Sequence, residues 1–499
     1  MADRPADART TGESGGELSS GERRAVLYGT LIRIAGTPVV AVAGLANTAV
    51  VVSHTGPAIF GVVTLIATVG LLFPFADLGI GAAVTTVSAR PGPLAADPVA
   101  RATIRRALGV LGVVGAAVAG LALTLGVADG WHQVIGLTTS PADRWAITVA
   151  LCLFAATIPA GLGTRILIGI DRNQLAVAIL MLNSIAGLTA TLALAAAGVS
   201  GIWFAVAGPA GALAGNLVAT VVALRLTGLR PAVLRAPAPV PAGSRLLAGS
   251  AWMFLIGIGL PLGLQSHRLL LAHLSTPDEL SRYALMAQIY ALTWSVFATA
   301  GMAFWPVFVK RRNDTGATVT LWRRAVLGFA GAAVPAAVLL AAGGPPAADL
   351  LGRGQITVSA GLATAFGLLL LTQCIHLPSG MLLTAPAELR WQAWCVLAMG
   401  LLGVVGGGLA ADRFGATGVV LAAAGAVLLA QVLPDLLGVP RLIDRRADRS
   451  EPPGEGPELG VAGGRVEPRP TQRGRTRDGV LRQRRFRAQP PHPGHQRLR

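Results

Sequence analysis

Charged residues, and acidic ones above all, are scarce in this sequence. Only 13% of the 499 residues are charged, and 24 Asp and Glu stand against 41 Lys and Arg. Lys310 is the single lysine, a skew typical of a GC-rich genome and without mechanistic meaning. A net charge of +17 would permit a nucleic-acid partner, so the placement of the charges has to decide whether one is expected.

The sequence also has few cysteines, and its first residues lack the features of a cleavable targeting sequence. The three cysteines, Cys152, Cys374 and Cys395, all fall inside apolar stretches. Their spacing excludes a disulfide framework and offers no metal-ligand set, so we expect no metal and no cofactor. Residues 1–24 are polar and have no apolar core, which argues against a cleaved signal peptide.

Long apolar runs are what the sequence has in abundance. Hydrophobic residues make up 53% of the chain and the mean hydropathy is +0.62. A membrane helix needs about 20 apolar residues, and about a dozen stretches qualify. We therefore predict an all-α membrane protein of about 12 transmembrane helices in two six-helix pseudo-repeats around a central cavity. The predicted spans are 25–52, 57–86, 104–127, 143–165, 173–198, 201–227, 248–273, 280–309, 320–343, 355–383, 390–411 and 415–437.

The basic residues between these spans indicate the orientation. With both termini inside, sixteen Arg and Lys lie in cytoplasmic connections, and four lie outside: Arg144, Arg282, Arg353 and Arg413. This asymmetry is the positive-inside pattern of multi-pass proteins. It predicts a bacterial inner-membrane protein with cytoplasmic ends, and it explains the basic charge without a nucleic-acid partner.

Composition also divides the chain into segments. A Pro- and Arg-rich linker separates two helical halves, and the C-terminal end holds 15 arginines with little apolar content from residue 439 onward. The predicted segments are a cytoplasmic tail (1–24), an N-terminal six-helix bundle (25–227), a linker (228–247), a C-terminal six-helix bundle (248–437) and a disordered basic cytoplasmic tail (438–499).

The two halves share short matches in the same order. Gly36-Thr37-Pro38 aligns with Gly259-Leu260-Pro261, and Phe60-Gly61 then falls on Tyr283-Ala284 without a gap. Two later matches pair Pro159-Ala160-Gly161 with Pro378-Ser379-Gly380, and Gly198, Gly201 and Gly208 with Gly415, Gly418 and Gly425. Helices six spans apart have the same orientation, so this is a parallel repeat, which predicts a substrate cavity between halves that rock.

Several motifs resemble one transporter family. They are Gly56-Pro57-Ala58-Ile59-Phe60-Gly61, Phe75-Ala76-Asp77-Leu78-Gly79-Ile80-Gly81, Arg268-Leu269-Leu270-Leu271 with Tyr283-Ala284-Leu285, the segment from Pro378 to Leu383, and Gly415-Ala416-Thr417-Gly418. Over residues 25–437 the chain resembles polysaccharide transporters of the multidrug/oligosaccharidyl-lipid/polysaccharide (MOP) flippase superfamily, which includes O-antigen flippases.

This resemblance implies a transport function and a set of partners. It implies movement of a lipid-linked oligosaccharide, usually carried on a polyprenyl diphosphate, from the inner to the outer leaflet. The implied partners are that polyprenyl-diphosphate-linked glycan, membrane lipids and cell-envelope glycan assembly proteins. The chain departs from the family at His267, where many relatives have an acid, and at Ser53, where a basic residue is common.

Two arginines inside predicted spans are the main candidate site residues. Arg33 shares a helical stripe of small and polar residues that ends at Asn47, and Arg268 shares one with Gln265, beside His267. A guanidinium suits phosphate because it donates paired hydrogen bonds. We hypothesise that the two arginines pass a diphosphate outward; the alternative is that each extends to the nearest membrane surface.

Weaker candidates complete the predicted site. Asp77 pairs with Arg33 in one conformation or stabilises a helix end, and the structural role is favoured. Gln288 and Tyr290 are predicted to contact sugar hydroxyls. Gln373 and His376 are predicted to be hydrogen-bonding partners between helices rather than ligands.

Other functions are less well supported. A cation-coupled multidrug exporter of the same superfamily is the alternative, but it needs buried acids, and the spans offer essentially Asp77 and Asp435. A membrane glycosyltransferase or polymerase needs acidic catalytic groups or large external loops. No nucleophile constellation or phosphate-binding glycine loop stands out, so we do not expect an enzyme.

Overall fold

A computed structural model describes residues 20–69, 80–90, 92–136, 140–230, 251–311 and 314–450. Chain contacts group residues 1–449 in one compact unit and residues 450–499 in a second. The described helices belong to the first unit, apart from the last residue of the final helix. Asp77, the linker from residue 231 and the basic tail beyond residue 450 lie outside the described residues.

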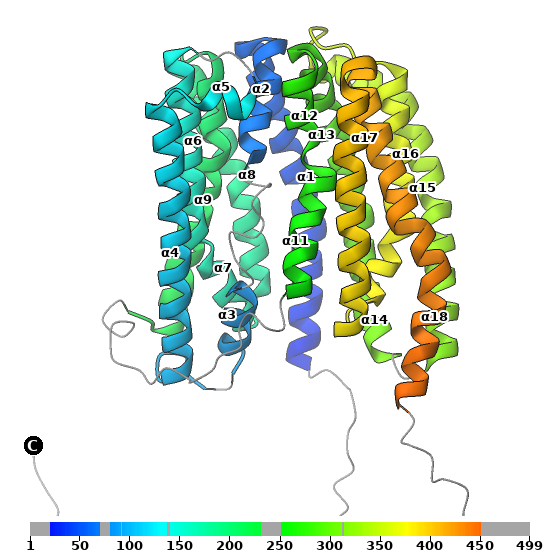
Figure 1. Ribbon diagram of the computed structural model, residues 1–499. Coiled ribbons are helices and arrows are strands. Elements are labelled where there is room, and N and C mark those ends of the chain that lie inside the picture. Colours follow the sequence, from blue (N-terminus) through cyan, green and yellow to red (C-terminus); the bar gives the residue numbers. More distant parts are fainter. Residues whose placement is uncertain are drawn as a thin grey trace, which may run out of the picture. The chain divides into compact units, whose positions relative to one another are not determined.

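The N-terminal half consists of helices and turns in its described part (Figure 1). Its helices are α1 (Ser20–Thr55), α2 (Pro57–Val69), α3 (Ile80–Ser88), α4 (Pro98–Val127), α5 (Trp131–Ile135), α6 (Pro141–Ala160), α7 (Leu162–Gly169), α8 (Asn173–Ala196), the 3₁₀-helix η3 (Gly201–Val206) and α9 (Ala207–Thr227). Polar caps begin several of them: Asp97 accepts from two N–H groups of α4, and Ser140 forms a capping box with Asp143 at α6.

The C-terminal half repeats this plan. Its helices are α11 (Ala251–Leu264), α12 (His267–Leu274), α13 (Pro277–Met302), α14 (Phe304–Lys310), α15 (Thr315–Leu351), α16 (Ala360–Leu382), α17 (Pro386–Val427), the π-helix η4 (Leu428–Val432) and α18 (Leu433–Ser450). α15 exceeds the predicted span 320–343 at both ends. α18 continues past residue 437, the predicted end of the last span.

Among the described residues, nine helices are long and apolar enough to cross a membrane, or ten when the bent pair α11 and α12 counts as one. One of the nine, Glu388–Arg445, has 58 residues. At 1.5 Å per residue it would be about 87 Å long, nearly three times the roughly 30 Å bilayer core. It is two spans, because the chain reverses at Gly415 and brings Gly406 against Ala422 (Figure 1).

The remaining span lies in the N-terminal half. The predicted span 57–86 covers the apolar segment Pro57–Ala67 within α2 and, at its other end, α3; residues 70–79 lie outside the described residues. Counted in this way, the spans agree with the predicted twelve-helix, all-α membrane architecture.

The predicted internal repeat is visible in the packing. α1 packs on α8 as α11 packs on α17, and α4 packs on α6 as α15 packs on α16. The aligned glycines Gly198 and Gly415 both have positive φ angles, 68° and 53°, at the turn before the sixth span of each half. Glycine adopts this conformation at little cost, so the match reflects a shared turn.

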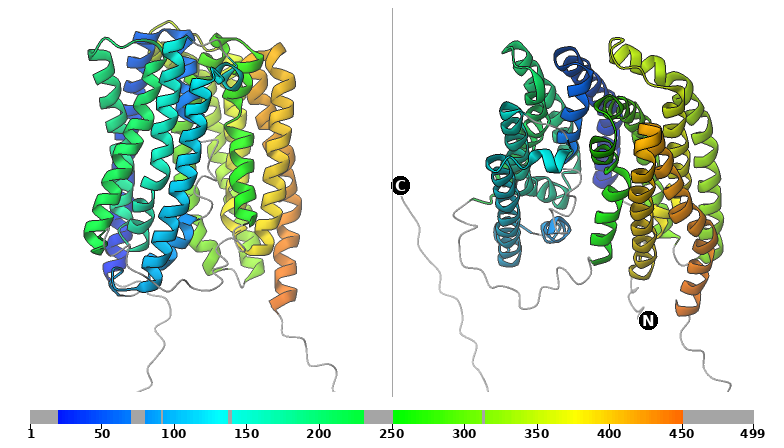
Figure 2. Two further views of the ribbon diagram at one scale, coloured as in Figure 1. Left: turned by 60° about the vertical axis from the view of Figure 1, so that its left-hand side comes forward. Right: turned by 45° about the horizontal axis from the view of Figure 1, so that its top comes forward.

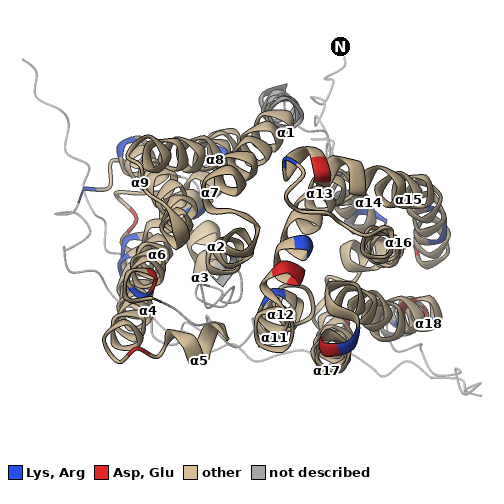
Figure 3. Ribbon diagram, turned by 90° about the horizontal axis from the view of Figure 1, so that it is seen from above, with Lys and Arg blue, Asp and Glu red and all other residues tan. Residues whose placement is uncertain are grey.

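The two halves form separate groups of helices (Figures 2 and 3). Helices α2 to α9 lie together on one side and α11 to α18 on the other when the bundle is viewed from above. Exposed apolar side chains such as Val113, Leu339 and Leu409 agree with a surface that faces lipid.

Buried side chains show where the halves join. One hydrophobic core takes Val52 and Phe60 from the N-terminal half and Leu271 and Tyr283 from the C-terminal half. A second core comes from the N-terminal half alone, and a third, around Phe308, from the C-terminal half alone. The shared core includes the turn between α1 and α2. The two separate cores lie towards the opposite ends of the helices. The halves are therefore joined on one side of the membrane, and each has a core of its own on the other side.

Candidate functional site

The seventh span is broken, and the break positions the main candidate residues. The N–H groups of Gln265 and Ser266 both donate to the carbonyl of Pro261, at 2.8 and 3.2 Å. The second bond joins residues five positions apart instead of the usual four, and this widens the helix locally, as in a π-bulge. α11 and α12 consequently meet at 43°. At two other prolines the outcome differs: α6 ends just after Pro159, whereas α16 continues through Pro378.

Arg268 lies in the first turn of α12 and turns towards α13. Its guanidinium carbon is 5.3 Å from the ring centroid of Tyr283, and Nη1 donates to Gln265 Oε1 at 3.4 Å. The side chain is half-buried, and Nε is buried without a hydrogen-bond partner. No carboxylate among the described residues pairs with it. An arginine at the centre of a membrane helix costs about 2.5–3.5 kcal/mol even on the milder scales, so an arginine within this broken span is a candidate functional residue.

His267 is fully buried beside Arg268. Its Nδ1 and the Tyr283 hydroxyl form a hydrogen bond of 3.0 Å, whereas Nε2 is buried without a partner. The structure thus brings together three predicted residues, Gln265, His267 and Arg268, around a fourth, Tyr283, that was noted only as part of a motif. The sequence could have predicted this contact. His267 and Tyr283 lie eight residues before and after Ser275, which is in the turn between two antiparallel helices, so the two side chains lie at equal depth.

Gln288 connects the two halves. Its Nε2 donates to the carbonyl of Gly44 at 3.0 Å, and Thr48 Oγ1 donates to Gln288 Oε1 at 2.5 Å. In this conformation the amide is therefore engaged between α13 and α1. Its predicted contact with sugar requires these bonds to open, and it stays a prediction.

Asn47 and Tyr290 have partners within their own halves. Asn47 Oδ1 accepts from Thr191 on α8 at 2.5 Å, and the Tyr290 hydroxyl donates to Gln373 Oε1 at 2.6 Å. The Gln373 contact is of the interhelical kind that the sequence predicted. Asp77 and the side chain of Arg33 lie outside the described residues, so their predicted roles stay predictions.

A close helix crossing joins the halves beside this site. The Gly61 N–H on α2 donates to Ser281 Oγ on α13 at 3.1 Å, and the Ser281 hydroxyl lies 2.5 Å from the carbonyl of Pro57. A methyl group at Gly61 would lie 2.5 Å from Ser281 Oγ and 2.9 Å from its backbone nitrogen. Glycine is therefore what permits α2 and α13 to approach so closely.

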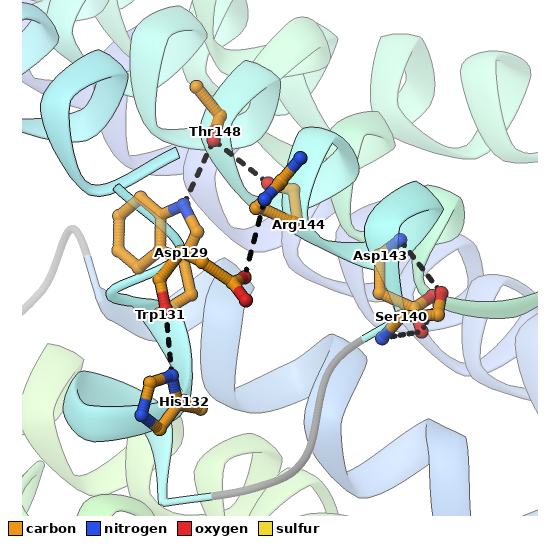
Figure 4. Close-up of polar contacts among 7 residues, drawn as sticks. All are labelled: Asp129, Trp131, His132, Ser140, Asp143, Arg144 and Thr148. Atoms are coloured by element: carbon orange, nitrogen blue, oxygen red, sulfur yellow. Dashed lines mark hydrogen bonds and ion pairs between the residues drawn. The ribbon is translucent and has the colours of Figure 1, made fainter. Parts of the chain in front are cut away.

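The short helix α5 makes a further contact between the halves. Trp131 anchors it by donating from Nε1 to Thr148 Oγ1 at 2.9 Å, and Arg144 lies 3.5 Å from Asp129 (Figure 4). α5 also reaches α12, where His273 Nε2 and the carbonyl of Gln133 are 3.2 Å apart. By the predicted topology these contacts close the external side.

A buried ion-pairing group lies elsewhere in the C-terminal half. His376 Nδ1 and Asp435 Oδ2 are 2.7 Å apart, and only 4% of the Asp435 side chain is exposed. Trp391 Nε1 donates to the other carboxylate oxygen at 3.3 Å. The carboxylate has partners on both oxygens, as the expected structural role of His376 requires. No group of three or more His, Cys, Asp or Glu side chains suited to a metal occurs in the described part of the chain.

Two repeated helical halves and a broken helix are architectural features of several secondary-transporter folds. No protein-family model and no curated protein matches the sequence, but solved structures match the fold. A multidrug resistance MATE family transporter of the MOP superfamily, in an inward-facing conformation, aligns with a TM-score of 0.62 at 13% identity, over 85% of this chain and 99% of that chain. The fold is therefore that of the MOP superfamily.

Two further structures support this fold and bear on its conformation. Lipid II flippase MurJ, in an inward closed conformation, aligns with a TM-score of 0.60 at 14% identity, over 83% of this chain and 87% of that chain. An outward-facing MATE family transporter gives a TM-score of 0.57 at 14% identity, over 85% and 96%. The predicted MOP-type fold is thus confirmed, in a multi-pass membrane protein; the substrate is a separate question.

Proposed function

We propose that this protein is a flippase that moves a lipid-linked oligosaccharide or polysaccharide precursor from the inner to the outer leaflet by alternating access. The observation that carries the proposal is Arg268, an intramembrane guanidinium without a carboxylate partner among the described residues. A phosphate or diphosphate headgroup supplies the missing negative charge and accepts the paired hydrogen bonds that a guanidinium donates.

The broken helix reinforces this preference for an anion. Arg268 lies at the N-terminal end of α12, where the helix dipole is positive and backbone N–H groups point out of the helix. Discontinuous helices with such ends bind anionic groups of substrates in several transporter folds. The likeness to a lipid II flippase supports a lipid-linked substrate as one that this fold can move.

The packing supports alternating access as the mechanism. The halves are joined by Gly61 with Ser281 and by Gln288 with Gly44 on one side, while each half has a core of its own on the other. With both termini in the cytoplasm of a bacterial inner-membrane protein, this is an inward-open state. We propose the bundles 25–227 and 248–437 as the rocking units and the segment 228–247 as their cytoplasmic linker.

The alternative, a cation-coupled multidrug exporter, has the MATE likeness and Asp435 in its favour. Asp435 already has His376 and Trp391 as partners, so it is poorly placed to compensate a cationic drug. Arg268 would repel such a substrate. The flippase proposal accounts for both residues, since transport of an anion needs no free acid.

Flipping of a fluorescent lipid-linked phosphosugar in proteoliposomes tests the proposal. A hydrogen bond to a charged group contributes about 1.5–3 kcal/mol, so Arg268→Gln should reduce the flipping rate at least tenfold. Arg282→Gln is the matched control, because Arg282 already pairs with Glu279 at 2.7 Å; it should stay within twofold of wild type. Equal flipping by Arg268→Gln and wild type, at equal protein levels, would rule out the proposed site.

A further inference from the structure

A cavity of about 510 Å³ lies between α13 and α15, apart from the site around Arg268. Ligand pockets commonly measure roughly 300–1,000 Å³. Its lining is apolar except for one cation, and comprises Val296, Phe297, Ala300, Phe304, Leu321, Arg324, Ala325, Gly328, Phe329 and Ala332. This set is called the α13–α15 groove below.

One face of α15, on which three of four residues are small, lines the groove. Leu321, Ala325, Gly328 and Ala332 recur at intervals of four, three and four residues, so they share one side of the helix. No atom lies within 4 Å of the position that a Cβ of Gly328 would occupy. The helices therefore leave room there for an additional apolar group.

Aromatic rings form the inner wall of the groove. Phe329 is 5.7 Å from Phe304 and 6.5 Å from Phe297, measured between ring centroids. The rim is open and apolar: Val296 on α13 is 63% exposed. An open apolar surface of this kind suits a flexible hydrocarbon chain lying against the rings.

Arg324 gives the groove a positive end. It lies near the beginning of α15, is exposed, and has no ion-pair partner among the described residues. Lys310, Arg311 and Arg323 are close to it in sequence. The one acid nearby, Asp314, accepts from the Ala317 N–H as the helix cap. The predicted topology places this end at the cytoplasmic leaflet, with the groove extending about 12 Å to Ala332 at 1.5 Å per residue.

We propose that the α13–α15 groove holds the hydrocarbon chain of the lipid carrier, with the carrier's phosphate at Arg324, before the headgroup moves to the transport site. This proposal rests on the flippase function proposed above and adds a loading site in the cytoplasmic leaflet. The charge complementarity selects a lipid with a phosphate head. α13 forms one wall of the groove and also carries Tyr283 and Gln288, so one helix connects loading with the site.

Native mass spectrometry of the purified full-length protein tests this site, with a long-chain polyprenyl phosphate as the probe. Gly328→Leu fills the groove and should weaken binding at least tenfold. Gly331→Leu is the matched control, because Gly331 is on the same helix, has equally open surroundings and does not line the groove. Arg324→Gln should also weaken binding at least tenfold, whereas Arg323→Gln should remain within twofold of wild type.

Comparison lipids identify the occupant. The matching polyprenol, which lacks phosphate, should bind at least tenfold more weakly and be indifferent to Arg324→Gln. Phosphatidylglycerol that displaces the probe at equal concentration would show a site for bulk lipid and overturn the proposal. So would unchanged probe binding by Gly328→Leu, or loss of a protein dimer in that variant without loss of lipid.

The loading site and the transport site can fail separately. Arg268→Gln should leave probe binding to the groove within twofold of wild type while it reduces flipping at least tenfold. Normal flipping by Arg268→Gln together with weak binding by Gly328→Leu would refute the flippase site and retain the groove. The reverse pattern would refute the groove and retain the flippase site.

Discussion

Replacing Gly61 by alanine should open the contact between the halves. The added methyl group would meet Ser281 Oγ at 2.5 Å and the Ser281 backbone nitrogen at 2.9 Å. The hydroxyl can rotate away, but the nitrogen cannot, so α2 and α13 must separate by about 0.5 Å to restore an ordinary contact. Overpacking of this kind costs about 1–3 kcal/mol, and that cost falls only on the joined state.

A cost of this size changes the conformational populations measurably. Between about 1 and 3 kcal/mol, the ratio of open to joined states rises roughly five- to 150-fold. Spin labels at His54→Cys and Asp278→Cys, both exposed near this contact, report the separation by double electron–electron resonance in a cysteine-free background. Gly61→Ala should add or enlarge a population at longer distance.

Two further variants make the test specific. Gly109→Ala, with no atom within 4 Å of the added methyl, should leave the distances unchanged. Ser281→Gly in the Gly61→Ala background removes only the hydroxyl and leaves the backbone nitrogen 2.9 Å from the added methyl, so the longer distance should persist. An unaltered distance distribution in a stably folded Gly61→Ala protein would refute the reasoning, because it would show that the crossing does not limit the separation.

Two predictions concern stability. His376→Ala leaves one oxygen of the buried Asp435 carboxylate without its hydrogen-bond partner, and such a loss costs about 1–3 kcal/mol; thermal unfolding in detergent should show a lower midpoint, and an unchanged midpoint would contradict the pairing. Gly211→Val places a Cβ 2.4 Å from the Gly187 backbone nitrogen, so monodisperse protein on size exclusion should be largely lost, whereas Gly208→Val, whose nearest contact is 4.0 Å, should be tolerated.

Hydropathy and charge were sufficient to predict most of the fold. The bilayer requires each span to satisfy its own backbone hydrogen bonds, so long apolar runs map directly onto helices, and the Gly198 and Gly415 turns follow the predicted repeat. The break after Pro261 was not predicted. A proline removes one hydrogen bond wherever it stands, but neighbouring helices decide whether the span bends, as the different outcomes at Pro261 and Pro378 show.

The candidate site was predictable only where its residues are neighbours along one helix. Gln265, His267 and Arg268 could be grouped from helical spacing, and they do lie together. Gln288 could not be assigned its partner, because Gly44 is 244 residues away in the sequence and no periodicity relates the two. The sequence also did not predict the α13–α15 groove. The groove depends on the distance between two helices and on how their side chains pack, and the spacing of residues along one helix gives neither.

The most direct measurement compares two substrate classes in the same proteoliposomes. One is a lipid-linked diphospho-oligosaccharide and the other a lipophilic cation, each supplied to the purified wild-type protein. An uncompensated guanidinium in the membrane predicts that the anionic glycolipid crosses between leaflets and that the cation does not. Export of the cation without movement of the glycolipid would contradict the account.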